Sequence, residues 1–205
     1  MFEDGLYAIT DSGLLRGVSL ETAVEQAIRG GARVIQYREK QLSGAETAEM
    51  ACSLASLCRR HGVPLIINDD VELAAGSGAS GVHLGGGDCP PDAAREQLGN
   101  DAIIGISCYD SLERARTAIA GGADYVAFGR FFPSHSKPEA VSADIPLLTR
   151  ARHAFDVPLV AIGGITPANG ADLLRAGADL LAVIHGVFGQ DDIEAAARRY
   201  ADLFL

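Results

Sequence analysis

The stretch LIINDDVELAAGSGASGVHLGGGD, residues 65–88, contains two short apolar runs, and each of them ends close to an acidic residue. The first run ends at Asp69, and the second is followed by Asp88. One acidic residue after a strand could cap the next helix. Two of them, at equivalent points of successive units, indicate a shared role.

The same unit recurs along the chain. A Gly-Ala pair precedes an apolar run in GGARVIQYR, SGASGVHLG, GGADYVAFG and AGADLLAVIHG, and a further apolar run lies between each of these. Eight strands are thereby predicted at residues 6–10, 34–38, 65–69, 81–85, 103–108, 125–129, 159–164 and 180–186. They rarely alternate with polar residues, as expected of parallel strands covered on both faces. The segments between them have helical spacing, and positive φ angles are expected where these helices end, at Gly31, Gly78, Gly122 and Gly177.

Eight alternating strand–helix units predict an α/β fold, a (β/α)₈ TIM barrel formed as a single domain by residues 1–205. An open, doubly wound sheet is the alternative. The eightfold count argues against it, and so does the lack of a G-x-G-x-x-G motif after the first strand.

The composition favours a protein that handles small molecules. The chain is 48% hydrophobic and 21% charged, enough for one core, and its net charge of −10 argues against a nucleic-acid-binding or polybasic membrane surface. The N-terminus MFEDGLYAITD lacks the features of a secretory signal, and no apolar run has the length of a membrane span. The cysteines form no C-x-x-C pair, so we expect reduced thiols and a cytoplasmic location; they are Cys52, Cys58, Cys89 and Cys108.

The barrel prediction places functional groups after the strands, on the C-terminal face. The seventh strand ends at Gly163-Gly164, and the eighth ends at His185-Gly186. Barrels often bind phosphate with these two loops, and glycine lets backbone N–H groups approach an anion closely. We therefore expect a monophosphate site at Gly164 and His185; an ordinary glycine turn is the alternative.

A second anion site is expected across the mouth of the barrel. Arg38 and Lys40 follow the second strand, and Lys137 follows the sixth. Beside them, Asp69 and Asp88 could hold Mg²⁺, which takes one or two carboxylates together with substrate phosphates. The alternative role of these acids is helix capping, which we assign to Asp70. Asp88 could cap the segment after Pro90-Pro91, although Asp92 is also available there.

The histidines are less informative. We expect His83 and His153 to be packing or surface residues. His135 and His185 lie at predicted strand exits, and neither has a visible carboxylate partner in the sequence.

At this point the chain resembles the thiamine-phosphate synthase family. The matching stretches are LYAITD, QYREK, INDD, GVHLGGGD, GISC, DYVAFGRFFPSHSKP, AIGGIT and LLAVIHGVF, in the family's order over nearly the whole chain. AIGGIT alone occurs in many phosphate-binding barrels, but the full set is specific. The resemblance implies a transferase of thiamine biosynthesis that joins hydroxymethylpyrimidine diphosphate to hydroxyethylthiazole phosphate and releases pyrophosphate.

The resemblance also implies roles for individual residues. Gln36, Arg38, Lys40, Asn68 and Lys137 would hold the diphosphate substrate, and Ser107 would contact the pyrimidine. Asp69 and Asp88 would bind Mg²⁺. The thiazole-phosphate side would be lined by Ser134, Ser136, Gly164, Ile184 and His185. Arg38, Lys40, Lys137 and Ser107 are the candidates for catalysis.

Some positions depart from the common family pattern. Gly86 stands where Gln is usual, Ser134 and Ser136 where Thr is common, and His185 where Ser is frequent. These departures affect fine substrate contacts. Two alternative functions remain, a thiazole tautomerase-like isomerase and a non-catalytic thiazole-phosphate binder; the retained cations and acids favour the synthase. Because minimal barrels often associate, we also expect a homodimer.

Overall fold

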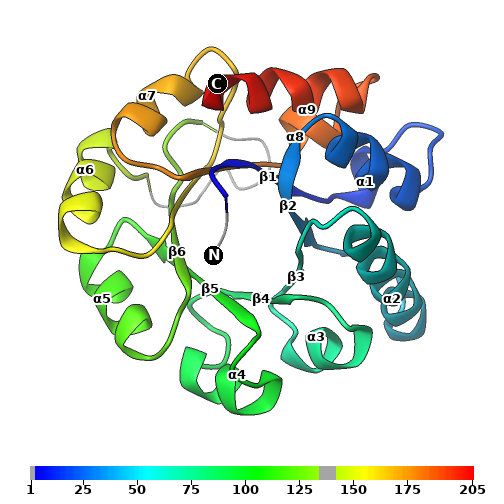
Figure 1. Ribbon diagram of the computed structural model, residues 1–205, viewed down its shortest axis with the longest axis horizontal. Helices are drawn as coiled ribbons and strands as arrows, with labels where there is room; N and C mark the ends of the chain where they lie inside the picture. The colour runs from blue at the N-terminus through cyan, green and yellow to red at the C-terminus, as the bar shows by residue number, and fades with distance from the viewer. Residues whose placement is uncertain (1–2, 134–141) are drawn as a thin grey trace.

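A computed structural model describes residues 3–133 and 142–205, and these form a closed parallel barrel with strand order β1 to β8. The barrel closes where β1 pairs with β8, with Leu6 opposite Leu181. Figure 1 shows the strands as an inner ring and the helices around them. The strands are β1 Gly5–Ile9, β2 Ala32–Tyr37, β3 Leu65–Asn68, β4 Gly81–Leu84, β5 Ile103–Tyr109, β6 Tyr125–Gly129, β7 Leu159–Ile162 and β8 Leu180–Val183.

The helices connect these strands on the outside of the ring. Their bounds are α1 Leu20–Arg29, α2 Gly44–Arg60, α3 Val71–Ser77, α4 Pro91–Leu98, α5 Leu112–Ala120, α6 Ile145–Ala154, α7 Gly170–Arg175, α8 His185–Phe188 and α9 Ile193–Ala201, with 3₁₀ turns η1 Ser12–Leu14 and η2 Asp202–Phe204. The predicted TIM barrel is confirmed. In the described part of the chain, no helix combines the length and apolarity that crossing a membrane requires.

The predicted strands match the observed ones to within a few residues at their ends. The largest difference is at the C-terminal end of β8, and differences of two residues occur at the start of β2 and at the end of β7. β7 stops at Ile162, because Gly163 and Gly164 turn the chain with φ angles of 102° and 65°. β8 stops at Val183, and His185, predicted as strand, is instead the first residue of α8.

Helix ends follow the sequence signals. The predicted positive φ angles are confirmed, with values of 101°, 72°, 94° and 110° at Gly31, Gly78, Gly122 and Gly177. Asp70 caps α3 as predicted, since its carboxylate accepts the N–H of Leu73 at 2.8 Å. Cys52 and Cys58 share α2 on different faces, one exposed and one buried.

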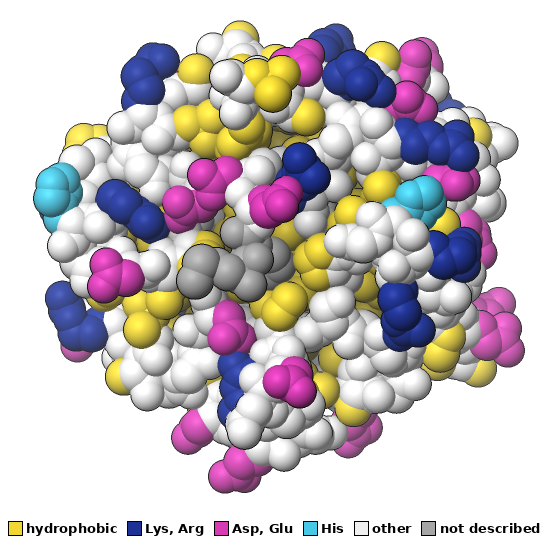
Figure 2. All heavy atoms as spheres, in the orientation of Figure 1, with side chains coloured by type: hydrophobic (Ala, Val, Ile, Leu, Met, Phe, Trp, Pro, Cys, Tyr) yellow, Lys and Arg dark blue, Asp and Glu magenta, His cyan; other side chains and the backbone are white. Residues whose placement is uncertain are grey.

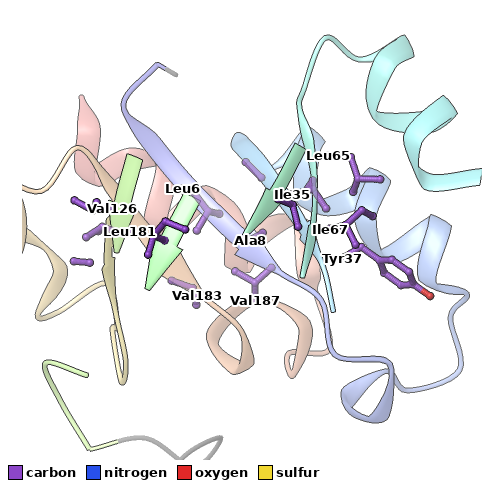
Figure 3. Close-up of a cluster of buried hydrophobic side chains, with 14 of the residues drawn as sticks. Leu6, Ala8, Ile35, Tyr37, Leu65, Ile67, Val126, Leu181, Val183 and Val187 are labelled. Carbon is purple, nitrogen blue, oxygen red and sulfur yellow. The ribbon is translucent and has the colours of Figure 1, made fainter. Parts of the chain in front are cut away.

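Side chains alternate along each strand between two apolar layers. Leu6, Ala8, Ile35, Leu65 and Ile67 point outward and pack against the helices, as Figure 3 shows. The intervening residues point into the barrel and form a second cluster. Its members are Tyr7, Ile9, Val34, Ile66, Tyr125, Ala127, Val160, Leu180 and Ala182. Both layers are needed because a closed parallel sheet is buried on each face.

Charge is mixed over the surface that can be seen. On the face shown in Figure 2, Lys and Arg side chains are interspersed with Asp and Glu. Although the net charge is −10, the acidic side chains on this face do not form one continuous patch.

The interior layer depends on one glycine in β5. Gly105 is paired with Tyr125 of β6, and the Tyr125 ring occupies the space that a side chain at residue 105 would fill. Tyr125 is fully buried and reaches across the barrel to Tyr7, whose hydroxyl lies 2.8 Å from its own. A residue with no side chain is thus required beneath this pair.

Gly105→Ala is expected to destabilise the protein by about 1–3 kcal/mol, because an overpacked interior forces the Tyr125 ring to move. Urea unfolding measures the change. Gly76→Ala is the matched control, since a Cβ at residue 76 of α3 meets open space; it should be neutral or stabilising. Equal stability of the two variants would contradict this role of Gly105.

Candidate active site

A cavity of about 550 Å³ opens at the C-terminal ends of the strands. This size suits a small-molecule ligand. It is lined by seven of the residues predicted from the sequence, namely Gln36, Arg38, Asn68, Ser107, Gly164, Ile184 and His185. Lys40, Asp69 and Asp88 are not among its lining residues, and Ser134, Ser136 and Lys137 lie outside the described part of the chain.

A chain of hydrogen bonds crosses the floor of the cavity. Gln36 Nε2 donates to the Tyr7 hydroxyl at 3.1 Å, and that hydroxyl lies 2.8 Å from the Tyr125 hydroxyl. The Tyr125 hydroxyl lies 2.9 Å from His83 Nδ1, and His83 Nε2 lies 2.9 Å from Ser107 Oγ. Five strands, β1, β2, β4, β5 and β6, each contribute one residue to this chain.

Only one donor in this chain has a fixed role, the Gln36 amide. Because the Gln36 amide donates to Tyr7, one arrangement has Tyr7 donating to Tyr125 and Tyr125 donating to His83 Nδ1. His83 then carries its proton on Nε2 and donates it to Ser107. In this arrangement the Ser107 hydroxyl keeps its own proton for a ligand in the cavity.

The two phenols in this chain stay neutral. Burial raises the pKa of Tyr7 and of Tyr125 above the usual tyrosine value. The floor of the cavity is therefore polar without carrying phenolate charge, which suits the recognition of a neutral heterocycle.

His83 was predicted to be a packing or surface residue; it does pack, but it also lines the cavity, which the sequence did not indicate. Its neighbours in β4, Val82 and Leu84, face the helices, so alternation turns His83 inward. The ring also stacks on Tyr125, with centroids 5.6 Å apart. The period of two along β4 was the signal that could have found it. His153 is exposed, with Nδ1 2.6 Å from the Thr149 carbonyl oxygen.

Arg38 is held at the cavity by two hydrogen bonds between its backbone and the Thr10 side chain. Thr10, fully buried at the end of β1, accepts the Arg38 N–H at 2.9 Å and donates to the Arg38 carbonyl at 3.2 Å. Among the described residues, no ion pair involves Arg38 or Lys40. Their positive charges are therefore available to an anionic ligand. Further cations that the sequence did not indicate line the cavity, Arg130 and Arg199.

Asp69 and Asp88, which follow the adjacent strands β3 and β4, are both exposed. The Asp69 N–H donates to the His83 carbonyl at 2.8 Å, which extends the β3–β4 pairing by one residue. The Asp88 carboxylate accepts the Gly85 N–H at 2.6 Å. Asp69 also has a φ of 64° and accepts a hydrogen bond from the Asn68 amide at 2.6 Å. The Asp69 backbone is thus held against β4, and the Asp88 carboxylate is held on the loop that follows β4.

Gly164 is required for a reason that the sequence did not indicate. A Cβ on this residue would overlap the backbone carbonyls of Phe132 and Pro133. The turn that contains Gly164 is braced by Asn169, whose Oδ1 accepts the Thr166 N–H at 2.7 Å and whose amide donates to the Gly164 carbonyl at 3.1 Å. A side chain at Gly164 would therefore disturb the packing of this loop as well as any bound phosphate.

The loop that carries Arg38 and Lys40 is anchored by Glu39. Its Oε1 accepts the N–H groups of Lys40 and Gln41, both at 2.6 Å, and the Ser12 hydroxyl at 3.0 Å. Partial burial acts to raise the pKa of Glu39, but these hydrogen bonds outweigh it and lower the pKa below the ordinary value of 4.5. Glu39 thereby joins the loops after β1 and β2.

Glu39→Gln is expected to lower stability at neutral pH, with a difference from the wild type that shrinks as the pH falls. A carboxylate with a lowered pKa contributes stability above the unfolded-state value near 4.5, and this contribution is lost as the pH falls through the lower folded-state pKa. Thermal unfolding of both proteins between pH 7 and 3 measures this. Glu49→Gln, at an exposed position in α2, is the control. A stability difference that does not depend on pH would contradict the role of the charge.

Known proteins resemble this chain over nearly its whole length. A family model described as thiamine monophosphate synthase matches residues 6–187. The thiamine-phosphate synthase of Marinobacter nauticus is 53% identical over 198 residues, covering 96% of this chain and 89% of that protein. The thiamine-phosphate synthase of Acidithiobacillus ferrooxidans is 50% identical over 203 residues, covering 98% and 94%.

A solved structure agrees with these sequence relatives. The thiamine phosphate pyrophosphorylase from Pyrococcus furiosus superposes with a TM-score of 0.88 at 34% identity, covering 97% of this chain and 94% of that chain. The family model and the relatives cover the strands whose ends build the cavity. The chain belongs to the thiamine monophosphate synthase family.

Proposed function

We propose that this protein joins hydroxymethylpyrimidine diphosphate to hydroxyethylthiazole phosphate, giving thiamine phosphate and pyrophosphate. Its relatives of about 50% identity carry the name of this activity. The observation that supports it most directly is the division of the site into two halves. Arg38 and Lys40, outside any ion pair of the described residues, lie at the exit of β2, and the glycine turn after β7 borders the same cavity.

The diphosphate half is built from the exits of β2, β3 and β4. Arg38 offers a planar fork for phosphate oxygens, and Lys40 offers a mobile charge. Asn68 lines the cavity beside them. Lys137, from the segment after β6, is proposed as a third cation on the sequence resemblance.

Mg²⁺ is proposed as the cofactor of this half. Asp69 and Asp88 fit such an ion, since both offer exposed carboxylate oxygens directly after or shortly after the adjacent strands β3 and β4. Among the described residues, no three His, Cys, Asp or Glu side chains gather in a metal-binding group, so the remaining ligands would be phosphate oxygens and water. When bound, Mg²⁺ supplies positive charge that neutralises the leaving pyrophosphate.

The pyrimidine is proposed to lie over the polar floor. The Ser107 hydroxyl and the Gln36 amide can hydrogen-bond to its ring nitrogens and amino group. The exocyclic C–O bond to the diphosphate breaks, and the electron-rich ring stabilises the cation that develops. The thiazole nitrogen then forms a bond to the same methylene carbon. Arg38 and Lys40 stabilise the charge that collects on pyrophosphate, so positioning and electrostatics suffice without a protein nucleophile.

The monophosphate half is proposed at the exits of β7 and β8. The turn from Gly163 to Pro167 borders the cavity, together with Ile184 and His185. Positive φ angles at Gly163 and Gly164 turn the chain away from the strand, and the carbonyls of both residues are already hydrogen-bonded, to the Phe132 N–H and the Asn169 amide. Their N–H groups are the proposed phosphate donors. The thiazole phosphate would bind here, with its ring directed toward the pyrimidine.

The two alternative functions make different demands on the site. A thiazole tautomerase-like isomerase needs no diphosphate half, and a non-catalytic thiazole-phosphate binder needs neither the acids nor the cations. Pyrophosphate release that requires both substrates supports the synthase over both alternatives. Homodimer formation and a cytoplasmic location stay predictions from the sequence.

Asp69→Asn and Asp88→Asn are expected to lower the rate of pyrophosphate release at low Mg²⁺, with partial recovery as Mg²⁺ rises, because each removes one anionic ligand. The assay measures pyrophosphate over a range of Mg²⁺ concentrations, and wild-type reactions omit each substrate in turn. Asp92→Asn, in the first turn of α4, is the matched acidic control. Variants with a wild-type Mg²⁺ dependence would show that the two carboxylates are structural.

Asn169→Ala is expected to weaken thiazole-phosphate binding about tenfold while leaving the diphosphate substrate unaffected, because loss of two hydrogen bonds loosens the turn at Gly164. Hydroxyethylthiazole without its phosphate should bind the wild type still more weakly. Calorimetry with each ligand separately measures both effects. Asn100→Ala, in the loop before β5, is the control. Equal weakening of both substrates in Asn169→Ala would contradict the separation of the two halves.

A further inference from the structure

Tyr109, the last residue of β5, connects the cavity to the segment after β4. Its ring lines the cavity, and its hydroxyl accepts the Gly86 N–H at 3.3 Å. Its φ of 54° is uncommon for a residue with a side chain. The strand ends in an irregularity between Ser107 and Tyr109, which turns this side chain away from the regular alternation.

Arg114 covers the outer side of this tyrosine. Its guanidinium carbon lies 5.2 Å from the centroid of the Tyr109 ring, within the range of a cation–π contact. The residue stands in the first turn of α5, where its N–H donates to the Ser111 hydroxyl at 3.1 Å. The ion pairs of the described residues do not include Arg114. It lies over the ring and close to Gly86, in the segment Gly85–Asp88 that follows β4 (the β4 loop).

Gly86 is the residue that lets Arg114 reach this place. A Cβ built on Gly86 would overlap the Arg114 guanidinium. Any larger residue at position 86 would thus displace the arginine from the Tyr109 ring. Gly86 and Arg114 are complementary in shape, one supplying the space and the other filling it.

The β4 loop carries Asp88 at its other end. The Asp88 carboxylate accepts the N–H of Gly85 at 2.6 Å, directly before the residue that Tyr109 holds. Three consecutive glycines, Gly85, Gly86 and Gly87, give this loop little stiffness of its own. Contacts from outside the loop must therefore fix it.

We propose that Arg114 and Tyr109 are positioning residues that hold the Gly85–Asp88 loop, and through it the Asp88 carboxylate, in the geometry that binds Mg²⁺ with the diphosphate. The effect on Mg²⁺ binding rests on the proposed function. The hold of Arg114 and Tyr109 on the loop, called the clamp below, can be measured separately. Tyr109 fixes the loop through its hydroxyl, and Arg114 fixes Tyr109 through its ring.

Two variants remove the two parts of the clamp with little change in volume. Arg114→Met keeps the side-chain length and removes the guanidinium, and Tyr109→Phe keeps the ring and removes only the hydroxyl. Both are expected to raise the Mg²⁺ concentration for half-maximal pyrophosphate release about three- to tenfold, the effect of one lost contact of ordinary strength. Because Arg114 does not line the cavity, turnover of Arg114→Met at saturating Mg²⁺ should stay close to that of the wild type, and its thiazole-phosphate affinity should not change.

The second readout needs neither metal nor substrate. Backbone ¹⁵N order parameters of Gly85 and Gly86 in the metal-free protein should fall in both variants, because the clamp on the loop is lost. Arg116→Met is the matched control. Arg116 stands on the same helix with its guanidinium carbon 5.8 Å from the Phe155 ring, away from the β4 loop, and its loss should change neither readout. Arg114→Lys should be intermediate, since it keeps the charge without the planar group.

The outcomes separate this inference from the proposed function. Unchanged order parameters in folded Arg114→Met would overturn the clamp. A looser loop with wild-type Mg²⁺ dependence would overturn the link to Asp88. If the wild type releases no pyrophosphate, the proposed function fails, and the order parameters alone decide whether Arg114 and Tyr109 hold the loop.

Discussion

The alternation of side chains along eight short parallel strands is the constraint on which the rest of this structure depends. Closure of the barrel gives every strand an inner and an outer face, and each residue is assigned to one of them by its register. The outer face packs against helices, and the inner face has room for few large groups. Gly105 and Tyr125 illustrate this limit on space, because the volume that a side chain at residue 105 would fill is occupied by the Tyr125 ring from the next strand.

The site continues this inner face beyond the apolar layer. Gln36, His83 and Ser107 are inward residues at the C-terminal ends of their strands, where water and a ligand can reach them. The charged groups follow once the ladder has ended, directly for Arg38 and Asp69, and three and four residues later for Lys40 and Asp88. Their positions are then set by local hydrogen bonds, as Thr10 does for Arg38 and Glu39 does for Lys40. The site thus has a hydrogen-bonded polar floor, and the loop after β2 that borders it is held by its own set of hydrogen bonds.

Much of this could be predicted from the sequence because the signals are local. Strand runs, the glycines at helix ends and the cap at Asp70 depend on residues close in the chain. Seven of the predicted site residues line the cavity, because strand exits meet on one face of a parallel barrel. The inward position of His83 follows from the period of two along β4, but its hydrogen bonds to Tyr125 and Ser107 come from other strands and have no local signal. The Tyr109–Arg114 pair was missed because it depends on an irregularity in β5 and on a space at Gly86, neither of which has a local signal. Likewise, the need for glycine at residue 164 arises from a loop more than 30 positions away.

The polar chain across the floor has a consequence for the sequences that can carry this activity. Each of its members comes from a different strand, and each satisfies the hydrogen-bonding group of the next. A change at Tyr7 alone leaves a buried partner unsatisfied, and so does a change at Tyr125 or His83. These positions, together with Gly105 beneath them, are therefore expected to co-vary across relatives and to change as a group. Residues on the rim of the cavity are expected to be substituted one at a time, whereas substitutions in the floor are expected to occur together.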